Sequence, residues 1–459
     1  MNWINFPKDF IWGTATASYQ IEGAYNEDEK GLSIWDDFSH KKGKIIDGTN
    51  GDIACDHYHR YIEDINLMSN LGYDAYRFSI AWTRIFPDGK GHINQKGVDY
   101  YNRLIDFLLE KKIKPFVTIF HWDLPLKLQE EGGFLNSDIS NYYSDYVSFL
   151  IKTFGDRVEN WITFNEPFIF AILGHLTGEH APGMKSIKAF FKVTHNLLLS
   201  HGKGVIAARS VNNKIKIGIT NNHSPIVHIK EILGGDLNKN DIKAKNFANA
   251  IFNTMYLDPI FNGKYPKETN FYVKFFNKKN NIDDDLKIIN QKIDFFGLNH
   301  YSRTVIANSI NPILKIKVIS PVGKTWAKEL TEMKWEIVPE SFYDILKFIW
   351  DNYCKKNNTP IYVTENGAAF NDTVNNGNIN DEKRIDYLKK YIKSMKKAMN
   401  DGVDVKGYFV WTFLDNFEWA HGKTKRFGLV YTDYETQKRI IKQSGYWYSK
   451  LCTEHGFIE

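Results

Sequence analysis

Short apolar runs alternate with amphipathic segments along the whole chain, a pattern that predicts strands separated by helices. The runs are rich in β-branched and aromatic residues, which fit a pleated strand, and the segments between them place apolar residues on one helical face. Helices are predicted around residues 61–68, 100–111, 193–208 and 384–399. Strands are predicted at residues 10–16, 75–82, 114–120, 158–164, 215–220, 294–299, 360–365 and 405–411.

This alternation predicts an α/β fold in which helices cover a parallel sheet. Eight is the number of strands that closes a (β/α)8 TIM barrel. A doubly wound open sheet is the competing fold, but no Gly-x-Gly-x-x-Gly pattern follows the first predicted strand. The chain has no linker rich in Pro, Gly or Ser and no short repeat. We therefore expect a single domain over residues 1–459, with elaborated loops after the strands.

The composition is that of an ordinary soluble globular protein. Of 459 residues, 43% are hydrophobic and 25% are charged, and the net charge of +5 is small for this length. Aromatic residues make up 15% of the chain. Most are expected in the core, but Trp also suits sugar rings, which are apolar plates edged with hydroxyl groups. The lysines are scattered, so we expect no nucleic-acid partner.

Three features predict a cytoplasmic protein. Cys55, Cys354 and Cys452 show neither metal-ligand spacing nor an even disulfide framework, which indicates reduced thiols. Residues 1–9 lack the basic and then apolar segments of a secretory signal. No apolar run approaches the roughly 18 residues that span a bilayer, so no membrane association is expected.

Two glutamates stand at the ends of predicted strands. Glu166 precedes Pro167, which cannot donate to a strand ladder, and Glu365 precedes a turn at Gly367. α/β proteins place their chemistry at the carboxyl ends of parallel strands. A single Glu in such a position is most often a helix cap or part of a surface ion pair. Two of them, each followed by a strand breaker, predict a carboxylate pair that faces one cleft.

Further polar and aromatic residues fall on the same rim of the predicted barrel. Taken one at a time, a rim histidine, a core tryptophan or a buried arginine needs no functional explanation. Their coincidence at one end of the barrel favours a site. These residues are Gln20, Arg77, His121, Trp122, Asp123, Asn165, Asn299, His300, Tyr301, Asn366, Trp411, Glu418 and Trp419.

A carboxylate pair of this kind is typical of glycosidic bond cleavage. One carboxyl group protonates the leaving oxygen, and a carboxylate acts from the opposite side of the sugar, either as a nucleophile about 5 Å away or through a water across a wider gap. The sequence leaves both geometries open. Arg77 and Tyr301 would keep Glu365 ionised, whereas burial and repulsion would raise the pKa of Glu166. Glu166 is therefore predicted to be the acid/base and Glu365 the nucleophile.

The chain resembles the family 1 glycoside hydrolases, which are retaining β-glucosidases and β-galactosidases with a (β/α)8 barrel. The resemblance extends from residues 10–23 to residues 445–448. Thr163–Pro167 matches the family's acid/base motif, and Thr364–Gly367 matches its nucleophile motif. The resemblance implies an exo-β-glycosidase that acts on β-glucosides, and on β-galactosides and β-fucosides, among them small β-glycosides and cello-oligosaccharides. It implies no cofactor and no metal.

The resemblance also assigns roles to residues on the rim. It implies that Arg77, Asn299 and Tyr301 orient the nucleophile, and that Trp335 is the wall of the leaving-group site. The residues that it assigns to the sugar are Gln20, His121, Trp122, Asn165, Trp411, Glu418 and Trp419.

One branch of the family cleaves 6-phosphorylated sugars, and this activity is the nearest alternative. That branch usually has Ser at the position of Glu418, together with a Lys and a Tyr slightly downstream. This chain has Lys425, but Glu418 and Phe427 occupy the other two places. Because a carboxylate repels phosphate, we expect unphosphorylated substrates. His300 is a further departure, since an aromatic residue such as Tyr is common there.

Two alternatives belong to other classes of protein. A non-hydrolytic, sugar-binding relative typically lacks one of the two glutamates, and both are present here. A metal-dependent barrel hydrolase needs a cluster of His and Asp on strand ends, and only His121 is suitably placed. No sequence feature specifies an oligomeric state.

Overall fold

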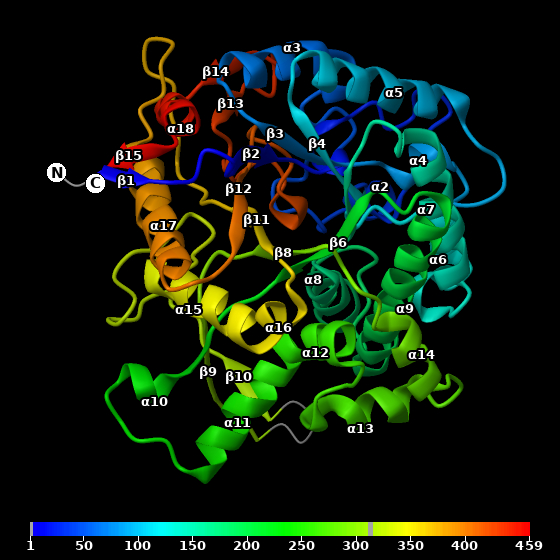
Figure 1. Ribbon diagram of the computed structural model, residues 1–459, viewed down its shortest axis with the longest axis vertical. Coiled ribbons are helices and arrows are strands. Elements are labelled where there is room, and N and C mark those ends of the chain that lie inside the picture. The colour runs from blue at the N-terminus through cyan, green and yellow to red at the C-terminus, as the bar shows by residue number, and fades with distance from the viewer. Residues whose placement is uncertain (1–2, 311–314) are drawn as a thin grey trace.

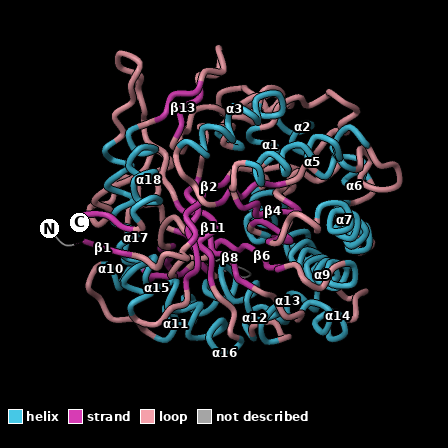
Figure 2. The backbone as a smooth tube through the Cα atoms, turned by 45° about the horizontal axis from the view of Figure 1, so that its top comes forward, coloured by secondary structure: helices cyan, strands magenta, loops and turns pink. Residues whose placement is uncertain are grey.

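Eight parallel strands form a closed barrel at the centre of the computed structural model, which describes residues 3–310 and 315–459. Residues 1–2 and 311–314 lie outside the described part, although the predicted N-terminal segment and the predicted single domain include them. Helices surround the barrel (Figures 1 and 2). In barrel order the strands are β11 (Ile361–Asn366), β12 (Val405–Trp411), β2 (Ile11–Ala15), β3 (Ala75–Ser79), β4 (Lys114–Phe120), β5 (Asn160–Asn165), β6 (Lys216–Asn222) and β8 (Phe295–Asn299).

The predicted (β/α)8 TIM barrel and its eight strands are confirmed. Strand ends differ from the predicted ones by up to three residues, as where β3 stops at Ser79 rather than at residue 82. β3 stops early because the short helix α4 (Trp82–Ile85) begins there and directs the chain away from the barrel. The doubly wound open sheet is excluded, because β12 pairs with β2 and closes the sheet.

The four predicted helices are present as α3, α5, α9 and α17. The remaining segments between strands carry additional helices. The helices are α1 (Ser18–Ile21), α2 (Ile34–Ser39), α3 (His57–Asn70), α4, α5 (Gln95–Glu110), α6 (Leu126–Glu130), α7 (Ile139–Phe154), α8 (Pro167–Ala171), α9 (Ile187–Val211), α10 (Ile229–Ile232), α11 (Lys239–Asn249), α12 (Met255–Asn262), α13 (Lys267–Phe276), α14 (Ile282–Ile289), α15 (Pro339–Ile349), α16 (Lys355–Asn357), α17 (Glu382–Asn400) and α18 (Gln443–Glu454).

Helix α5 illustrates how the sequence specifies these elements. It begins where the side chain of Asn94 accepts a hydrogen bond from the backbone N–H of Lys96, which satisfies one of the free donors at a helix start. Tyr101, Leu104 and Leu108 recur at helical spacing and are buried. The capped start and the apolar face together fix both the limits of α5 and the side that packs toward the barrel.

Among the described residues, seven short strands outside the barrel form small sheets that the sequence pattern did not predict. β1 (Trp3–Asn5) pairs antiparallel with β15 (Gly456–Ile458), which brings the two ends of the described chain together (Figure 1). Each of these two strands has only three residues, which is too few to show an alternation of polar and apolar side chains. Only the pairing between them defines them as strands. The others are β7 (Ile226–His228), β9 (Thr304–Asn308) and β10 (Ile316–Val318) in one sheet, and β13 (Val430–Thr432) with β14 (Arg439–Ile441) in another.

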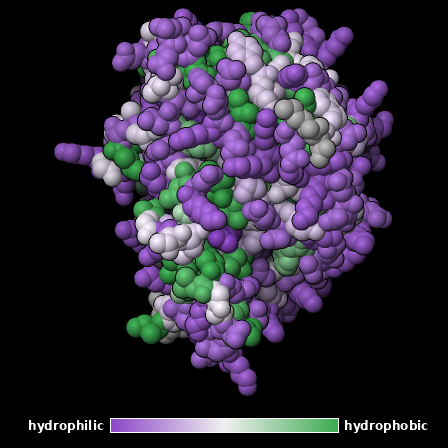
Figure 3. All heavy atoms as spheres, turned by 90° about the vertical axis from the view of Figure 1, so that its left-hand side faces the viewer, coloured by the Kyte–Doolittle hydropathy of each residue, from purple (hydrophilic) through white to green (hydrophobic). Residues whose placement is uncertain are grey.

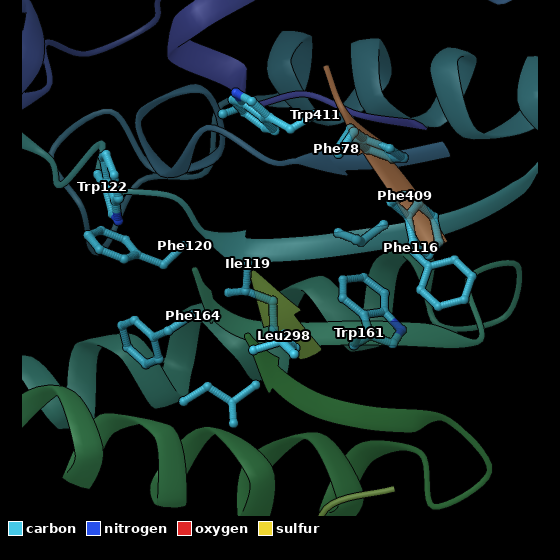
Figure 4. Packing of buried hydrophobic residues seen from close by; sticks show 14 of the residues in the cluster. Phe78, Phe116, Ile119, Phe120, Trp122, Trp161, Phe164, Leu298, Phe409 and Trp411 are labelled. Atoms are coloured by element: carbon cyan, nitrogen blue, oxygen red, sulfur yellow. The ribbon is translucent and has the colours of Figure 1, made fainter. Parts of the chain in front are cut away.

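Buried aromatic and aliphatic side chains pack closely on the barrel strands (Figure 4). Phe116 packs against Phe409 with ring centroids 4.9 Å apart and against Tyr362 at 5.4 Å. Gly13 on β2 leaves room for the Phe409 ring, since a Cβ there would lie 2.6 Å from it. Dense packing of this kind holds the strands in a fixed register, and it therefore fixes where their carboxyl ends point.

Polar side chains cover most of the face shown in Figure 3. Cys55, Cys354 and Cys452 are buried and free. Within residues 3–310 and 315–459, no helix is both long enough and apolar enough to cross a bilayer.

Candidate active site

The carboxyl ends of the barrel strands surround a pocket of about 440 Å³, which lies within the usual range for ligand sites. Arg77, Asn299 and Gln20 lie directly behind the pocket wall, where each is buried and hydrogen-bonded to residues of the wall. The other predicted site residues line the pocket itself. They are His121, Trp122, Asn165, Glu166, Tyr301, Trp335, Glu365, Trp411, Glu418 and Trp419.

Glu166 follows the last residue of β5 and stands at the start of α8, where Pro167 is the first helical residue. Its backbone φ of 47° lies in the left-handed region, which residues other than glycine rarely adopt. Oε1 of Glu166 accepts hydrogen bonds from Nδ2 of Asn299 at 2.7 Å and from Nδ2 of Asn222 at 3.4 Å. Burial first, and then the nearby charge of Glu365, raise the pKa of Glu166 to about 8.

Glu365 lies in β11 and faces a cation. Nη1 of Arg77 donates to its Oε1 at 2.6 Å, and the hydroxyl group of Tyr301 donates to its Oε2 at 2.7 Å. Burial raises the pKa of Glu365 above its ordinary value, and the Arg77 charge and the Tyr301 hydrogen bond act in the opposite direction. Arg77 thus lies beside Glu365 and offsets the effect of burial on the pKa of Glu365 only in part. Two residues later, position 367 requires glycine, because a Cβ there would lie 1.9 Å from the carbonyl oxygen of Trp411.

Asn165 and Asn299 connect the two carboxyl groups. Nη2 of Arg77 donates to Oδ1 of Asn165 at 2.6 Å, and Nδ2 of Asn299 donates to the same oxygen at 3.1 Å. Asn299 was predicted to orient Glu365, but the structure places its amide at hydrogen-bonding distance from Glu166. It also helps to lower the pKa of Glu365, so it acts on both groups. The two glutamates therefore belong to one hydrogen-bonded network at one end of the barrel.

His121 is held as a neutral donor. Its Nε2 lies 2.9 Å from Nδ2 of Asn165, an amide nitrogen that can only donate, so Nε2 accepts and the proton resides on Nδ1. Burial and the charge of Arg77 keep the pKa of His121 well below its ordinary value. Its buried Nδ1 has no partner in the described part of the chain. This buried N–H therefore lacks a protein acceptor, although His121 lines the pocket.

Gln20 and Glu418 form a second polar corner. Nε2 of Gln20 donates to the carbonyl oxygen of Phe417 at 2.9 Å and to Oε2 of Glu418 at 3.4 Å. Its buried Oε1 has no partner among the described residues. Burial, together with the charge of Glu365, raises the pKa of Glu418 to about 8. Adjacent donors and acceptors of this kind match the vicinal hydroxyl groups of a sugar.

Tryptophan rings line the space between these polar groups. The Trp122 ring packs against Trp419 at 4.7 Å, and its Nε1 donates to the carbonyl oxygen of Asn165 at 2.9 Å. Trp411 stacks near the His121 ring at 6.0 Å. Trp335 lies on the outer side of the pocket, and its ring centroid is 5.1 Å from that of Tyr301. The pocket thus has apolar faces and polar edges.

Sequence reasoning missed several residues of the pocket wall. Asn222 ends β6 and contacts Glu166, and the run of polar residues after the fifth predicted strand was the signal that could have identified it. The loops that supply the outer wall carry no such signal. The further wall residues are Ile169, Leu173, Glu179, His180, Ser224, Ser302, Arg303, Thr304, Met333, Ala420, His421 and Phe427. Within the described ranges, no group of three or more His, Cys, Asp or Glu side chains is arranged to hold a metal ion.

Comparison with known proteins places this geometry in a family. Residues 3–457 match the sequence pattern of "Glycosyl hydrolase family 1". The chain belongs to glycosyl hydrolase family 1. It is 48% identical over 99% of both chains to a "1,4-beta-D-glucan glucohydrolase" of Thermotoga neapolitana, and 48% identical over the full length of both chains to "Beta-glucosidase A" of Acetivibrio thermocellus.

The fold agrees with that of solved members. The family 1 β-glucosidase of Thermotoga maritima superposes with a TM-score of 0.93 at 47% identity, covering 99% of this chain and 100% of the other. The Thermotoga maritima family 1 glycoside hydrolase, complexed with a cyclophellitol analogue transition state mimic, superposes with a TM-score of 0.94 over the full length of both chains. Family membership and the (β/α)8 fold are thus supported by both sequence and structure.

Proposed function

We propose that the protein is a β-glucosidase that releases terminal non-reducing β-D-glucosyl residues with retention of configuration. The names of its relatives support the glucosidase activity. The observation that carries the mechanism is the unequal surroundings of the two carboxyl groups. Glu365 faces a guanidinium and a phenol, whereas the hydrogen-bond donors to Glu166 are neutral amides. The first environment favours a carboxylate and the second a carboxylic acid.

In this mechanism Glu166 gives its proton to the leaving oxygen while an oxygen of Glu365 attacks the anomeric carbon. The C–O bond to the leaving group breaks, and a covalent glycosyl-enzyme forms. Glu166, now ionised, takes a proton from a water, which attacks the anomeric carbon and releases Glu365. A pKa of about 8 keeps Glu166 protonated near neutral pH in the free enzyme. Arg77 and Tyr301 hold Glu365 in place throughout.

The polar corner and the tryptophans supply the proposed sugar site. Nδ1 of His121 and the free Oε1 of Gln20 would bind hydroxyl groups far from the reacting bond, with Glu418 beside them. Asn165 would contact the 2-hydroxyl, and Trp411 would stack on the sugar face. We propose that β-galactosides and β-fucosides are accepted as well, because they share the β-anomeric centre and the 2- and 3-hydroxyl groups of β-glucosides and differ only at carbons 4 and 6. Trp122 and Trp419 complete the wall.

A 6-phospho-β-glucosidase is disfavoured by the chemistry of the same corner. Glu418 is buried there, and an acidic side chain is a poor partner for phosphate. Nζ of Lys425 donates instead to the carbonyl oxygen of Glu332 at 3.0 Å. Phe427 offers no polar group. Comparing turnover of an aryl β-glucoside with that of its 6-phosphate tests the choice, and faster turnover of the phosphate would overturn it.

A rescue experiment tests the mechanism. Glu365→Gly should abolish hydrolysis of an aryl β-glucoside, and azide or formate should restore turnover with inverted products. If neither azide nor formate restores turnover, the result contradicts Glu365 as the nucleophile and the double displacement with it. Measuring the rate in the presence of a chelator separates this mechanism from the metal-dependent hydrolase, for which the rate would fall.

We further propose that residues 1–459 act as one catalytic domain and that the protein works in the reducing cytoplasm. Barrel strands drawn from residue 11 to residue 411 support the single domain. The three buried free cysteines support the compartment. Its partners would be small β-glycosides and cello-oligosaccharides.

A further inference from the structure

The outer wall of the pocket is built on an ion pair that the proposed mechanism does not use. Arg303 follows Tyr301 by two residues and lines the pocket together with Ser302 and Thr304. Its Nε and Nη2 each donate at 2.8 Å to a carboxylate oxygen of Glu336, which is buried. The hydroxyl group of Ser302 donates to the carbonyl oxygen of Glu336 at 2.7 Å. Glu336 is therefore held both by its side chain and by its backbone.

This ion pair fixes the turn that carries Trp335. Glu336 pairs with Leu330 in an antiparallel bridge, and the backbone N–H of Thr331 donates to the carbonyl oxygen of Trp335 at 2.9 Å. Trp335 in turn contacts the ring of Tyr301, whose hydroxyl group binds Glu365. A bidentate Arg–carboxylate pair is geometrically strict, so it sets the orientation of the Trp335 wall relative to the nucleophile.

One nitrogen of Arg303 remains uncommitted. A guanidinium carries five N–H donors, and Nε and Nη2 are occupied by Glu336. Nη1 has no hydrogen-bond partner within residues 3–310 and 315–459. The Arg303 guanidinium lies 5.8 Å from the Trp326 ring, which packs against it, and its side chain is 20% exposed. Because the residue lines the pocket, Nη1 is available to a ligand on the leaving-group side.

The charge of the pair defines the ligand. Glu336 neutralises Arg303, so an anionic leaving group would meet a carboxylate as well as a guanidinium. A neutral hydroxyl or ring oxygen is not repelled by the carboxylate and can accept a hydrogen bond from the free N–H donors. We propose that Arg303 determines specificity for the leaving group, both by positioning Trp335 and by donating from Nη1 to a hydroxylated leaving group such as a second sugar. This inference rests on the proposed glycosidase function and deepens it.

The test compares a sugar and an apolar phenol as leaving groups. Arg303→Met keeps the length of the side chain and removes its donors. Because a hydrogen bond to a charged group contributes about 1.5–3 kcal/mol, kcat/KM for cellobiose should fall by about tenfold or more. The loss on an aryl β-glucoside should be several-fold smaller, because the phenol offers Nη1 no hydroxyl acceptor. Arg157→Met is the matched control, since Arg157 forms a surface ion pair with Asp106.

Further variants separate positioning from simple loss of charge. Arg303→Lys keeps the charge but cannot bind Glu336 through two parallel bonds, so it should recover only part of the cellobiose activity, mainly as a lower KM than that of Arg303→Met. Thermal unfolding is recorded for each variant. If Arg303→Met does not fold, Glu336→Gln replaces it as the variant that weakens the ion pair. It should raise KM for cellobiose more than KM for the aryl glucoside.

The outcomes distinguish this inference from the function beneath it. A wild-type protein that hydrolyses neither substrate contradicts the proposed function. A wild-type protein that hydrolyses the aryl glucoside but not cellobiose overturns the inference alone. So does an equal loss on both substrates in Arg303→Met, or full cellobiose activity in Arg303→Lys.

Discussion

The two ends of the barrel interior have opposite chemistry, although the same strands supply both. Toward the amino ends, Phe116, Tyr362 and Phe409 are packed ring against ring. At the carboxyl ends, Glu166 and Glu365 are buried in a polar network, and burial raises the pKa of each. The apolar end gains free energy from packing, and the polar end loses some to desolvation. The comparison indicates that the packed end maintains a pocket whose own groups oppose folding.

The largest expected effect lies at the polar end. Glu166→Gln removes the proton donor, so hydrolysis of a β-glucoside with a poor leaving group should slow by about 10²–10⁴-fold, the usual contribution of general acid catalysis. Aryl glucosides with activated phenols need no proton and should lose far less in the first step. Steady-state and burst kinetics on an alkyl and an activated aryl glucoside measure the difference. Equal losses on both would contradict the acid/base role.

The packed end should respond in stability. Phe409→Ala leaves a cavity beside Gly13 and Phe116, and it should lower the free energy of unfolding by about 3–5 kcal/mol. Denaturant unfolding measures the change, and the exposed Phe271→Ala is the control. A loss as small as that of the control would show that the aromatic packing does not stabilise the barrel.

The polar end should also show a pH-dependent cost. The folded pKa of Glu166, about 8, lies above its ordinary 4.5, so the native state binds a proton that the unfolded state releases. Its contribution to stability is complete below about 4.5 and is lost as the pH rises through about 8. Glu166→Gln should therefore match the wild type at pH 4 and exceed it at pH 9 by on the order of a few kcal/mol.

Thermal unfolding of both proteins across this range measures the prediction. The exposed Glu435→Gln serves as the control for loss of a surface carboxyl group. A constant difference between Glu166→Gln and the wild type from pH 4 to pH 9 would contradict a raised pKa in the folded state.

The smallest effect concerns a single hydrogen bond. Tyr301→Phe removes the 2.7 Å bond to Glu365, which should lower kcat/KM for an aryl glucoside by about 10–100-fold. Because this bond lowers the pKa of Glu365, its loss should also move the acidic limb of the pH–rate profile to higher pH. Tyr61→Phe, a change on α3 away from the pocket, is the control. An unchanged acidic limb would show that Tyr301 does not stabilise the carboxylate.

Local pattern accounted for much of this architecture. The apolar runs located all barrel strands, because strands buried on both faces must be almost continuously hydrophobic. The strand breaker Pro167 marked where β5 gives way to Glu166. Asn222 was missed although it ends a strand in the same way, because it lay just beyond the predicted limit of residue 220.

Other features had no local signal. The ion pair between Arg303 and Glu336 joins residues 33 positions apart on irregular segments, and neither residue type predicts such a contact from the sequence. Asn299 could be placed on the rim, but the choice between Glu166 and Glu365 as its partner depended on side-chain directions. The short outer strands, such as β1 with β15, exist only because distant segments meet.

By itself, the sequence determined the order of strands and helices and the set of side chains delivered to one rim, since both follow from periodicity and from residues that interrupt strands. Only the tertiary structure decided how those side chains share protons. Closure of the barrel sets the burial of Glu166 and Glu365 and brings Arg77 to Glu365 and amide donors to Glu166. Burial and neighbouring charge fix a pKa, and both are properties of the folded chain.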